Sequence, residues 1–146
     1  MCPALQLRLP NVAASAGVAR PALLEHIATH ALTPVLVYRL ELVLEEALMN
    51  RQWHAWHAGG QHDTALKVRV TADAVEMCFE DDGVAFDPLQ VAPAPRPASL
   101  DDAVPGGLGL MLMRRAATAC HYARVDGRNR WTLPFARPVA ASPEAR

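Results

Sequence analysis

Short stretches in which apolar and polar residues alternate are spread along the whole chain. Alternation with a period of two is typical of a strand that buries one face. Pro10 and Asn11 close the first stretch, and residues 71–73 separate the next two, which predicts antiparallel neighbours. Two further segments flank Gly127 and are predicted to form a closing hairpin. The predicted strands are residues 5–9, 65–70, 74–79, 121–126 and 129–135.

Apolar residues recur at helical spacing in three other segments. The first segment is rich in alanine and contains Pro21, which is expected near the start of a helix or at a kink. Thr33 and Pro34 fit an N-cap followed by proline at the first helical position. Gly59 and Gly60 are expected to end the long helix that follows. The predicted helices are residues 13–31, 35–57 and 109–118.

The order of these elements predicts an α+β fold. Helices gathered on one face of an antiparallel sheet make a two-layer α/β sandwich, here with a mixed, mostly antiparallel sheet. Residues 1–138 are interpreted as a single domain and residues 139–146 as a flexible C-terminal tail. Residues 88–105 are rich in proline and have no hydrophobic period. A long irregular loop inside a compact domain is more often a lid or a binding loop than padding.

Composition narrows the class of protein. Among 146 residues, 14 are basic and 15 acidic, so the net charge is -1. The chain has no excess of basic residues that would indicate binding to nucleic acid. It also has no apolar run that approaches the length of a membrane span. The three cysteines are widely spaced and form no CxxC motif, which fits the reducing cytoplasm. The expectation is a cytoplasmic domain that binds neither nucleic acid nor membrane.

Glu46 and Asn50 lie on neither the core side nor the solvent side of the long predicted helix. At about 100° per residue, Glu41 and Glu45 mark the solvent side and Leu44 the core side. Glu46 and Asn50 fall on a flank beside the core. One interpretation is a half-buried hydrogen bond between these two side chains, which are four residues apart. The other is a base and a metal ligand that face a cleft.

Two further motifs carry candidate chemistry. Asp81-Asp82-Gly83 follows a predicted strand directly and could be an ordinary turn. It could equally present a carboxylate to an exocyclic amine, beside a glycine that leaves room for the ligand. The glycine cluster at residues 106–110 opens a predicted helix, where backbone N–H groups can bind phosphate. Such a cluster can also merely join a loop to a helix.

In this order, the three motifs resemble those of the GHKL (Bergerat) ATP-binding fold of histidine kinases, DNA gyrase, Hsp90 and MutL. Within that group the chain is most similar to the small anti-sigma-factor serine/threonine kinases of bacterial partner switching. EEALMNRQWH (45–54) resembles their N-box, DDGVAFDP (81–88) their first glycine box and GGLGLMLMRR (106–115) their second. The resemblance extends over residues 5–135.

The resemblance implies a role for each motif residue. Glu46 would be the general base near the γ-phosphate of ATP, and Asn50 would hold Mg²⁺ through its side-chain oxygen. His54 would lie near the phosphates or brace the helix. Asp81 would accept a hydrogen bond from the adenine amino group, and Gly83 would leave room for the ring. The residues expected to wrap the phosphates are Gly107, Leu108, Gly109 and Leu110.

Three positions depart from the family's pattern. Ala85 stands where the first glycine box usually has a second glycine. Pro105 precedes the second box, where a phosphate-contacting basic residue can occur, so Arg96 is the candidate in the proline-rich segment. Asn129 stands in place of a Gly-Thr pair in the last strand and could substitute for it. Since Glu46, Asn50 and Asp81 are all kept, a working kinase is expected.

The implied function is that of a Mg-ATP-dependent protein serine/threonine kinase acting as an anti-sigma regulator. Its substrate would be a serine or threonine of an anti-anti-sigma (STAS) protein, and its second client a sigma factor or an analogous regulator. Arg20 matches an arginine that related kinases use against both partners, although it could be only a surface residue. The kinase could also form a homodimer. The alternative is a nucleotide-gated binding module without phosphoryl transfer.

Overall fold

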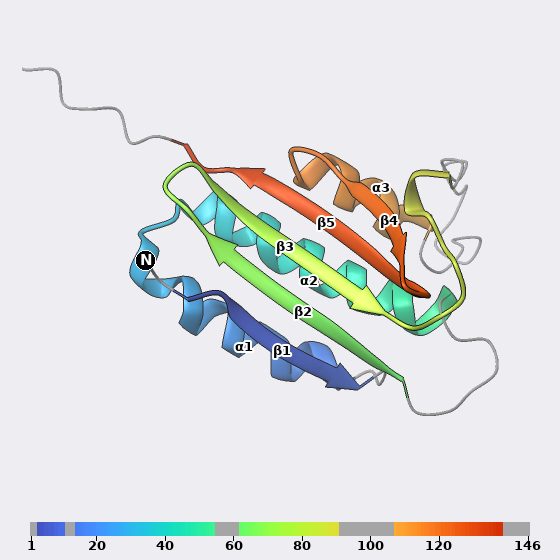
Figure 1. Ribbon diagram of the computed structural model, residues 1–146. Helices are drawn as coiled ribbons and strands as arrows, with labels where there is room; N and C mark the ends of the chain where they lie inside the picture. Colours follow the sequence, from blue (N-terminus) through green and yellow to red (C-terminus); the bar gives the residue numbers. More distant parts are fainter. Residues whose placement is uncertain (1–2, 11–13, 55–61, 91–106, 139–146) are drawn as a thin grey trace, which may run out of the picture.

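A five-stranded antiparallel sheet forms one layer of the protein. The computed structural model describes residues 3–10, 14–54, 62–90 and 107–138. The strands lie in the order β1-β2-β3-β5-β4, and every neighbouring pair is antiparallel (Figure 1). The strands are β1 (Leu5–Pro10), β2 (Asp63–Val70), β3 (Ala74–Asp81), β4 (His121–Val125) and β5 (Arg128–Ala136).

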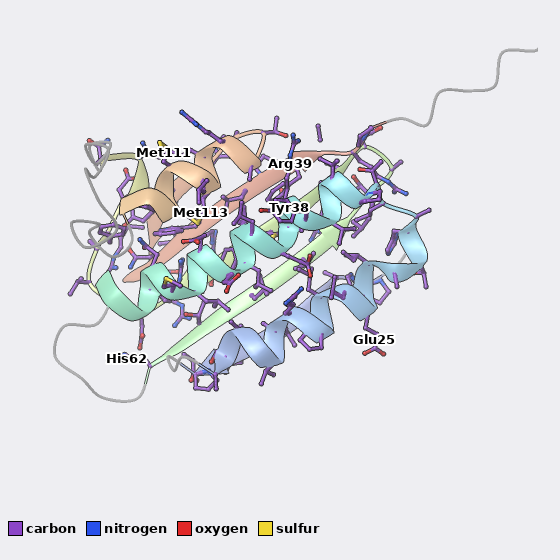
Figure 2. The ribbon with its side chains drawn as sticks, turned by 180° about the vertical axis from the view of Figure 1, so that it is seen from behind. Glu25, Tyr38, Arg39, His62, Met111 and Met113 are labelled. Atoms are coloured by element: carbon purple, nitrogen blue, oxygen red, sulfur yellow. The ribbon has the colours of Figure 1, made fainter. Side chains whose placement is uncertain are left out.

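The helices form the second layer, on one face of the sheet. Seen from behind the sheet, α1, α2 and α3 lie side by side across it (Figure 2). This arrangement confirms the predicted α+β sandwich, with a sheet that is antiparallel throughout the described strands. The helices are α1 (Ser15–Ile27), α2 (Pro34–His54) and α3 (Gly107–Ala116), with short 3₁₀ turns η1 (Ala28–His30) and η2 (Pro88–Gln90).

The core fills the space between the two layers. On α2, Leu44 and its row neighbours Leu40 and Ala47 are almost completely buried, which confirms the predicted core side of this helix. Glu45 is exposed and Glu46 half-buried, as the flank position requires. Alternate residues of β3 complete the core from the sheet: Val75, Met77 and Phe79.

Local signals in the sequence explain where several elements begin and turn. The Oγ1 of Thr33 accepts a hydrogen bond of 3.2 Å from the amide of Leu36, so Thr33 caps α2 as predicted. Asp126 and Gly127 both have positive φ, of 51° and 75°, which suits a two-residue hairpin turn between β4 and β5. Pro21 is the seventh residue of α1 rather than near its start.

The predicted strand ends need one correction that matters for the site. The second hairpin strand extends to Asp81, two residues beyond the predicted end. Asp81 is therefore the last residue of β3 rather than part of the following turn. Since side chains alternate along a strand, Asp81 faces the helix layer like Phe79.

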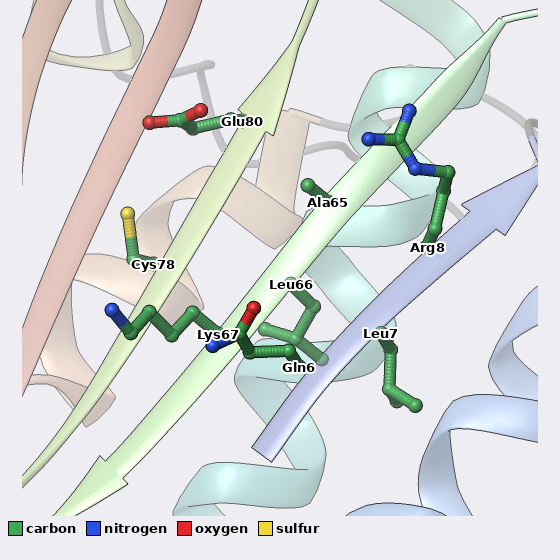
Figure 3. A pocket seen from close by; sticks show the side chains of 8 residues that line it. All are labelled: Gln6, Leu7, Arg8, Ala65, Leu66, Lys67, Cys78 and Glu80. Carbon is green, nitrogen blue, oxygen red and sulfur yellow. The ribbon is translucent and has the colours of Figure 1, made fainter. Parts of the chain in front are cut away.

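The other face of the sheet carries no helix among the described residues. A shallow hollow on this face is lined by β1, β2 and β3 (Figure 3). Its polar side chains include Lys67, Cys78 and Glu80, which alternate with core residues along their strands.

No helix in the described part of the chain is both long and apolar enough to span a bilayer. Arg96, Pro105 and the predicted tail, residues 139–146, lie outside the described residues, as does most of the predicted lid.

Candidate functional site

The predicted site residues come from three elements that meet on the helix side of the sheet. Glu46 and Asn50 lie on α2, Asp81 ends β3, and the glycine cluster begins α3. Helix α3 packs against α2 (Figure 2). The packing of these elements therefore gathers residues that are up to about 60 positions apart in the sequence.

Glu46 points from α2 toward the first turn of α3. A Cβ placed on Gly109 would overlap the Glu46 carboxylate and would lie 3.2 Å from Glu46 Cδ. Glycine is thus required at position 109 if the carboxylate is to keep this place. Burial raises the pKa of the Glu46 carboxyl, and the neighbouring charge of Glu45 raises it further. A higher pKa makes a carboxylate a better proton acceptor.

Asn50 is an unpaired amide in a buried position. Its residue is 3% exposed, and neither its Oδ1 nor its Nδ2 has a hydrogen-bond partner among the described residues. A hydrogen bond between Glu46 and Asn50, the alternative left open by the sequence, is therefore absent. Buried side-chain amides are nearly always paired, so Asn50 keeps its capacity to bind an ion, a water or a ligand group.

Asp81 is surrounded by donors. Its Oδ1 accepts hydrogen bonds of 2.9 Å from the amide of Gly83 and from Nδ2 of Asn129. Its Oδ2 lies 2.8 Å from Nε of Arg51, and both side chains of this ion pair are almost completely buried. The DDG motif thus does build a turn, through Gly83. An ordinary surface turn, however, needs neither a buried aspartate nor a buried arginine paired with it.

Asn129 joins three parts of the site. It lies directly opposite Asp81 in the β3–β5 pair, so both side chains are on the same face of the sheet. Its Nδ2 also donates to the carbonyl of Val84 at 2.8 Å. Its Oδ1 accepts from the Tyr122 hydroxyl at 2.7 Å and from the amide of Phe86 at 3.2 Å. Asn129 therefore holds the segment after β3 against the hairpin.

The first turn of α3 presents the backbone amides of a helix N-terminus. The first amides of any helix lack partners within the helix, and its N-terminus carries a partial positive charge. No acidic residue occupies the first turn of α3. Gly107 and Leu108 begin the helix, and Gly109 and Leu110 follow as buried residues. This arrangement suits an anionic group such as phosphate.

Arg51 is the site residue that the sequence interpretation missed. It is 1% exposed and follows Asn50 directly. Its guanidinium lies 4.1 Å from the centre of the Trp131 ring and 5.3 Å from that of Phe79. Burial lowers the pKa of Arg51 to about 10, although Asp81 opposes the shift. The signal was present, because position 51 continues the row of Leu44 and Ala47 at helical spacing.

The remaining two predicted residues, Arg20 and His54, are not seen in contact with this site among the described side chains. Arg20 lies on α1, is exposed, and forms an ion pair of 2.8 Å with Glu41 of α2. His54 is the last residue of α2, and its side chain lies outside the described part of the structure.

Comparison with known proteins decides the family. Residues 9–134 match the family described as histidine kinase-like ATPase domain. The chain belongs to the histidine kinase-like ATPase family. It is 42% identical over 111 residues to the serine/threonine-protein kinase BtrW of Bordetella bronchiseptica, an overlap of 75% of this chain and 78% of that protein. The predicted resemblance is thereby confirmed.

A solved structure supports the same fold. The chain is similar to the crystal structure of the RsbU and RsbW domains of Rv1364c from Mycobacterium tuberculosis, with a TM-score of 0.64. The two share 15% sequence identity, and the match covers 94% of this chain but 34% of that longer one. At this identity the likeness establishes the fold and nothing more.

Membership in a family of ATPase domains implies ATP as the ligand, and the residues present fit it. Asn50 offers an unpaired amide oxygen, which is a ligand type that Mg²⁺ accepts. Since Mg²⁺ takes few protein ligands and completes its shell with water and phosphate oxygens, a single amide suffices. The start of α3 offers backbone donors to phosphate, and Asp81 offers a carboxylate to an amine.

Proposed function

We propose that this protein is a Mg-ATP-dependent protein serine/threonine kinase that regulates by partner switching. The observation that carries the proposal is the unpaired, buried Asn50 one helical turn from the half-buried Glu46. A base and a metal ligand four residues apart on one helix address the same phosphate. The identity to a protein named as a serine/threonine kinase supports the same activity.

In the proposed reaction, Glu46 takes the proton from a serine or threonine hydroxyl of the substrate. The hydroxyl oxygen forms a bond to the γ-phosphorus of ATP, and the bond from that phosphorus to the bridging oxygen breaks. ADP leaves with the electron pair of the broken bond. Asn50 would hold the Mg²⁺ that neutralises the phosphate charge. The first-turn amides of α3, including that of Gly109, would hold the phosphates in line.

The proposed substrate is a serine or threonine of an anti-anti-sigma (STAS) protein. The second proposed client is a sigma factor or an analogous regulator, which the kinase sequesters. Arg20 is the proposed partner contact, because it is exposed on α1 and held in place by Glu41. A homodimer is part of the same proposal.

The test compares two neighbouring carboxylates. Glu46→Gln keeps the shape of the side chain but removes the charge that accepts the proton. Phosphorylation of a cognate STAS protein, followed with labelled ATP and Mg²⁺, should slow by about 10²–10⁴-fold, the usual contribution of a general base. ATP affinity and stability should stay close to those of the wild type. Glu45→Gln is the matched control: Glu45 is exposed, and losing its charge removes only the smaller of the two causes of the raised Glu46 pKa, so the rate should change far less than in Glu46→Gln.

The second candidate function, a nucleotide-gated binding module, predicts a different outcome. A binding module needs the ATP site but no proton transfer. If the wild type never phosphorylates a cognate STAS protein yet binds it only with ATP present, the binding module is correct. If Glu46→Gln phosphorylates at the wild-type rate, the assigned base is wrong.

A further inference from the structure

Arg51 follows the proposed metal ligand Asn50 and forms a buried ion pair with Asp81, the carboxylate proposed to bind adenine. The Nε of Arg51, on α2, lies 2.8 Å from Oδ2 of Asp81 on β3. Its Nη2 also donates to the carbonyl of Phe79 at 3.4 Å. A single side chain therefore links the helix that carries Glu46 and Asn50 to the strand that ends in Asp81.

Stability alone does not explain this pair. Both side chains are at most 2% exposed, so both charges lose their hydration. Replacing such a pair by well-packed apolar residues of similar volume is often neutral or stabilising. The surroundings of Arg51 are suitable for an apolar residue, since the Phe79 and Trp131 rings lie against it. The Arg51 guanidinium at this position therefore indicates a function that depends on the Asp81 carboxylate.

The donors around Asp81 are unequally shared between its two oxygens. A carboxylate has about four acceptor positions, two on each oxygen. Oδ1 uses two of them, for the amide of Gly83 and for Nδ2 of Asn129. Among the described residues, Oδ2 is in an ion pair with Nε of Arg51 and accepts no other side-chain donor, so it keeps acceptor capacity for a ligand. The planar guanidinium, 2.8 Å from Oδ2, restricts how the carboxylate can turn.

We propose that Arg51 is a positioning residue that makes Asp81 selective for a purine with a 6-amino group. The inference rests on the proposed function, because it assumes that ATP binds at this site. Arg51 holds the carboxylate so that Oδ2 can accept a hydrogen bond from the amino group. A 6-oxo purine such as guanine presents an acceptor there and meets the carboxylate unfavourably.

The test uses two ligands that differ only in the amino group: ATP and purine riboside triphosphate. Affinities are measured by calorimetry with Mg²⁺ for the wild type, Arg51→Lys, Arg51→Met and Arg39→Met. Wild type should prefer ATP by about 10–150-fold, the range for a hydrogen bond to a charged group. Both Arg51 variants should reduce this preference to below about threefold and leave the affinity for the analogue nearly unchanged. Arg39 is an exposed arginine of the same helix, so Arg39→Met should keep the full preference.

Each outcome decides the question. A variant that weakens both ligands equally shows that Arg51 only supports the fold, and this overturns the inference alone. A wild type that binds both ligands equally also overturns it. A wild type that binds neither ligand overturns the proposed function as well. Arg51→Lys keeps the positive charge beside Asp81, so it carries the test if Arg51→Met does not fold.

Discussion

Replacing Gly109 with alanine should leave the stability of the fold nearly unchanged and slow the proposed phosphorylation. Gly109 is the third residue of α3 and is buried against α2. The only described glycine with positive φ is Gly127, so alanine fits the backbone at position 109 without strain. The added Cβ would overlap the Glu46 carboxylate, which must then turn away.

Two opposing contributions set the expected change in stability. Alanine is more favourable than glycine in a helix by about 0.8–1 kcal/mol. Forcing a side chain off its rotamer costs about 0.5–1.5 kcal/mol, so the two effects nearly cancel. The free energy of unfolding should therefore stay within about 1 kcal/mol of the wild type. A displacement of about 1 Å at a reacting group can cost about 10²-fold in rate, which is the expected loss of phosphorylation.

The assay measures thermal unfolding, ATP affinity and the rate of STAS-protein phosphorylation on the same preparations. Gly17→Ala is the matched control. Gly17 is an exposed glycine within α1, and a Cβ added there would meet nothing within 4 Å. This control should be slightly stabilised and should phosphorylate at the wild-type rate. If Gly109→Ala is folded and equally fast, the Glu46 carboxylate is not the base or does not need this position.

Three further predictions follow from the same site. Asp81→Asn leaves Arg51 buried without its counter-ion, so the free energy of unfolding should fall by about 3–5 kcal/mol in urea titrations. ATP affinity of the folded fraction should fall by about 1.5–3 kcal/mol in calorimetry, and no change in either quantity would refute the role of the pair. Because burial raises the pKa of Glu46 and the ionised form is the base, the phosphorylation rate should rise with pH through a midpoint above 4.5, the ordinary glutamate value. A pH profile that is unchanged in Glu46→Gln would contradict this assignment. Residues 89–106 should gain protection from hydrogen exchange when ATP and Mg²⁺ bind, and equal exchange in both states would argue against a lid.

Much of the fold followed from local pattern. Alternation along residues 65–70 and 74–79 predicted the hairpin because a strand with one buried face must alternate. Thr33 and Pro34 predicted the start of α2 because capping is a local interaction. The sequence pattern predicts the end of β3 two residues too early. Asp81 is polar and looked like turn, whereas the pairing of β3 with β5 extends the strand to it.

The sequence by itself determined which residues are unusual: Glu46 and Asn50 on the flank of an amphipathic helix, and glycines at the start of another. It did so because period and spacing are local properties of the chain. Only the tertiary structure decided what these residues face. Helical spacing puts Arg51 on the core side of α2, but only the packing of α2 on the sheet brings it within 2.8 Å of Asp81, thirty positions away. From the sequence, Gly109 could merely join a loop to a helix. Once α3 packs on α2, the Glu46 carboxylate occupies the space where a side chain of residue 109 would lie. Contacts between distant segments depend on the packing of whole elements, which no local pattern encodes.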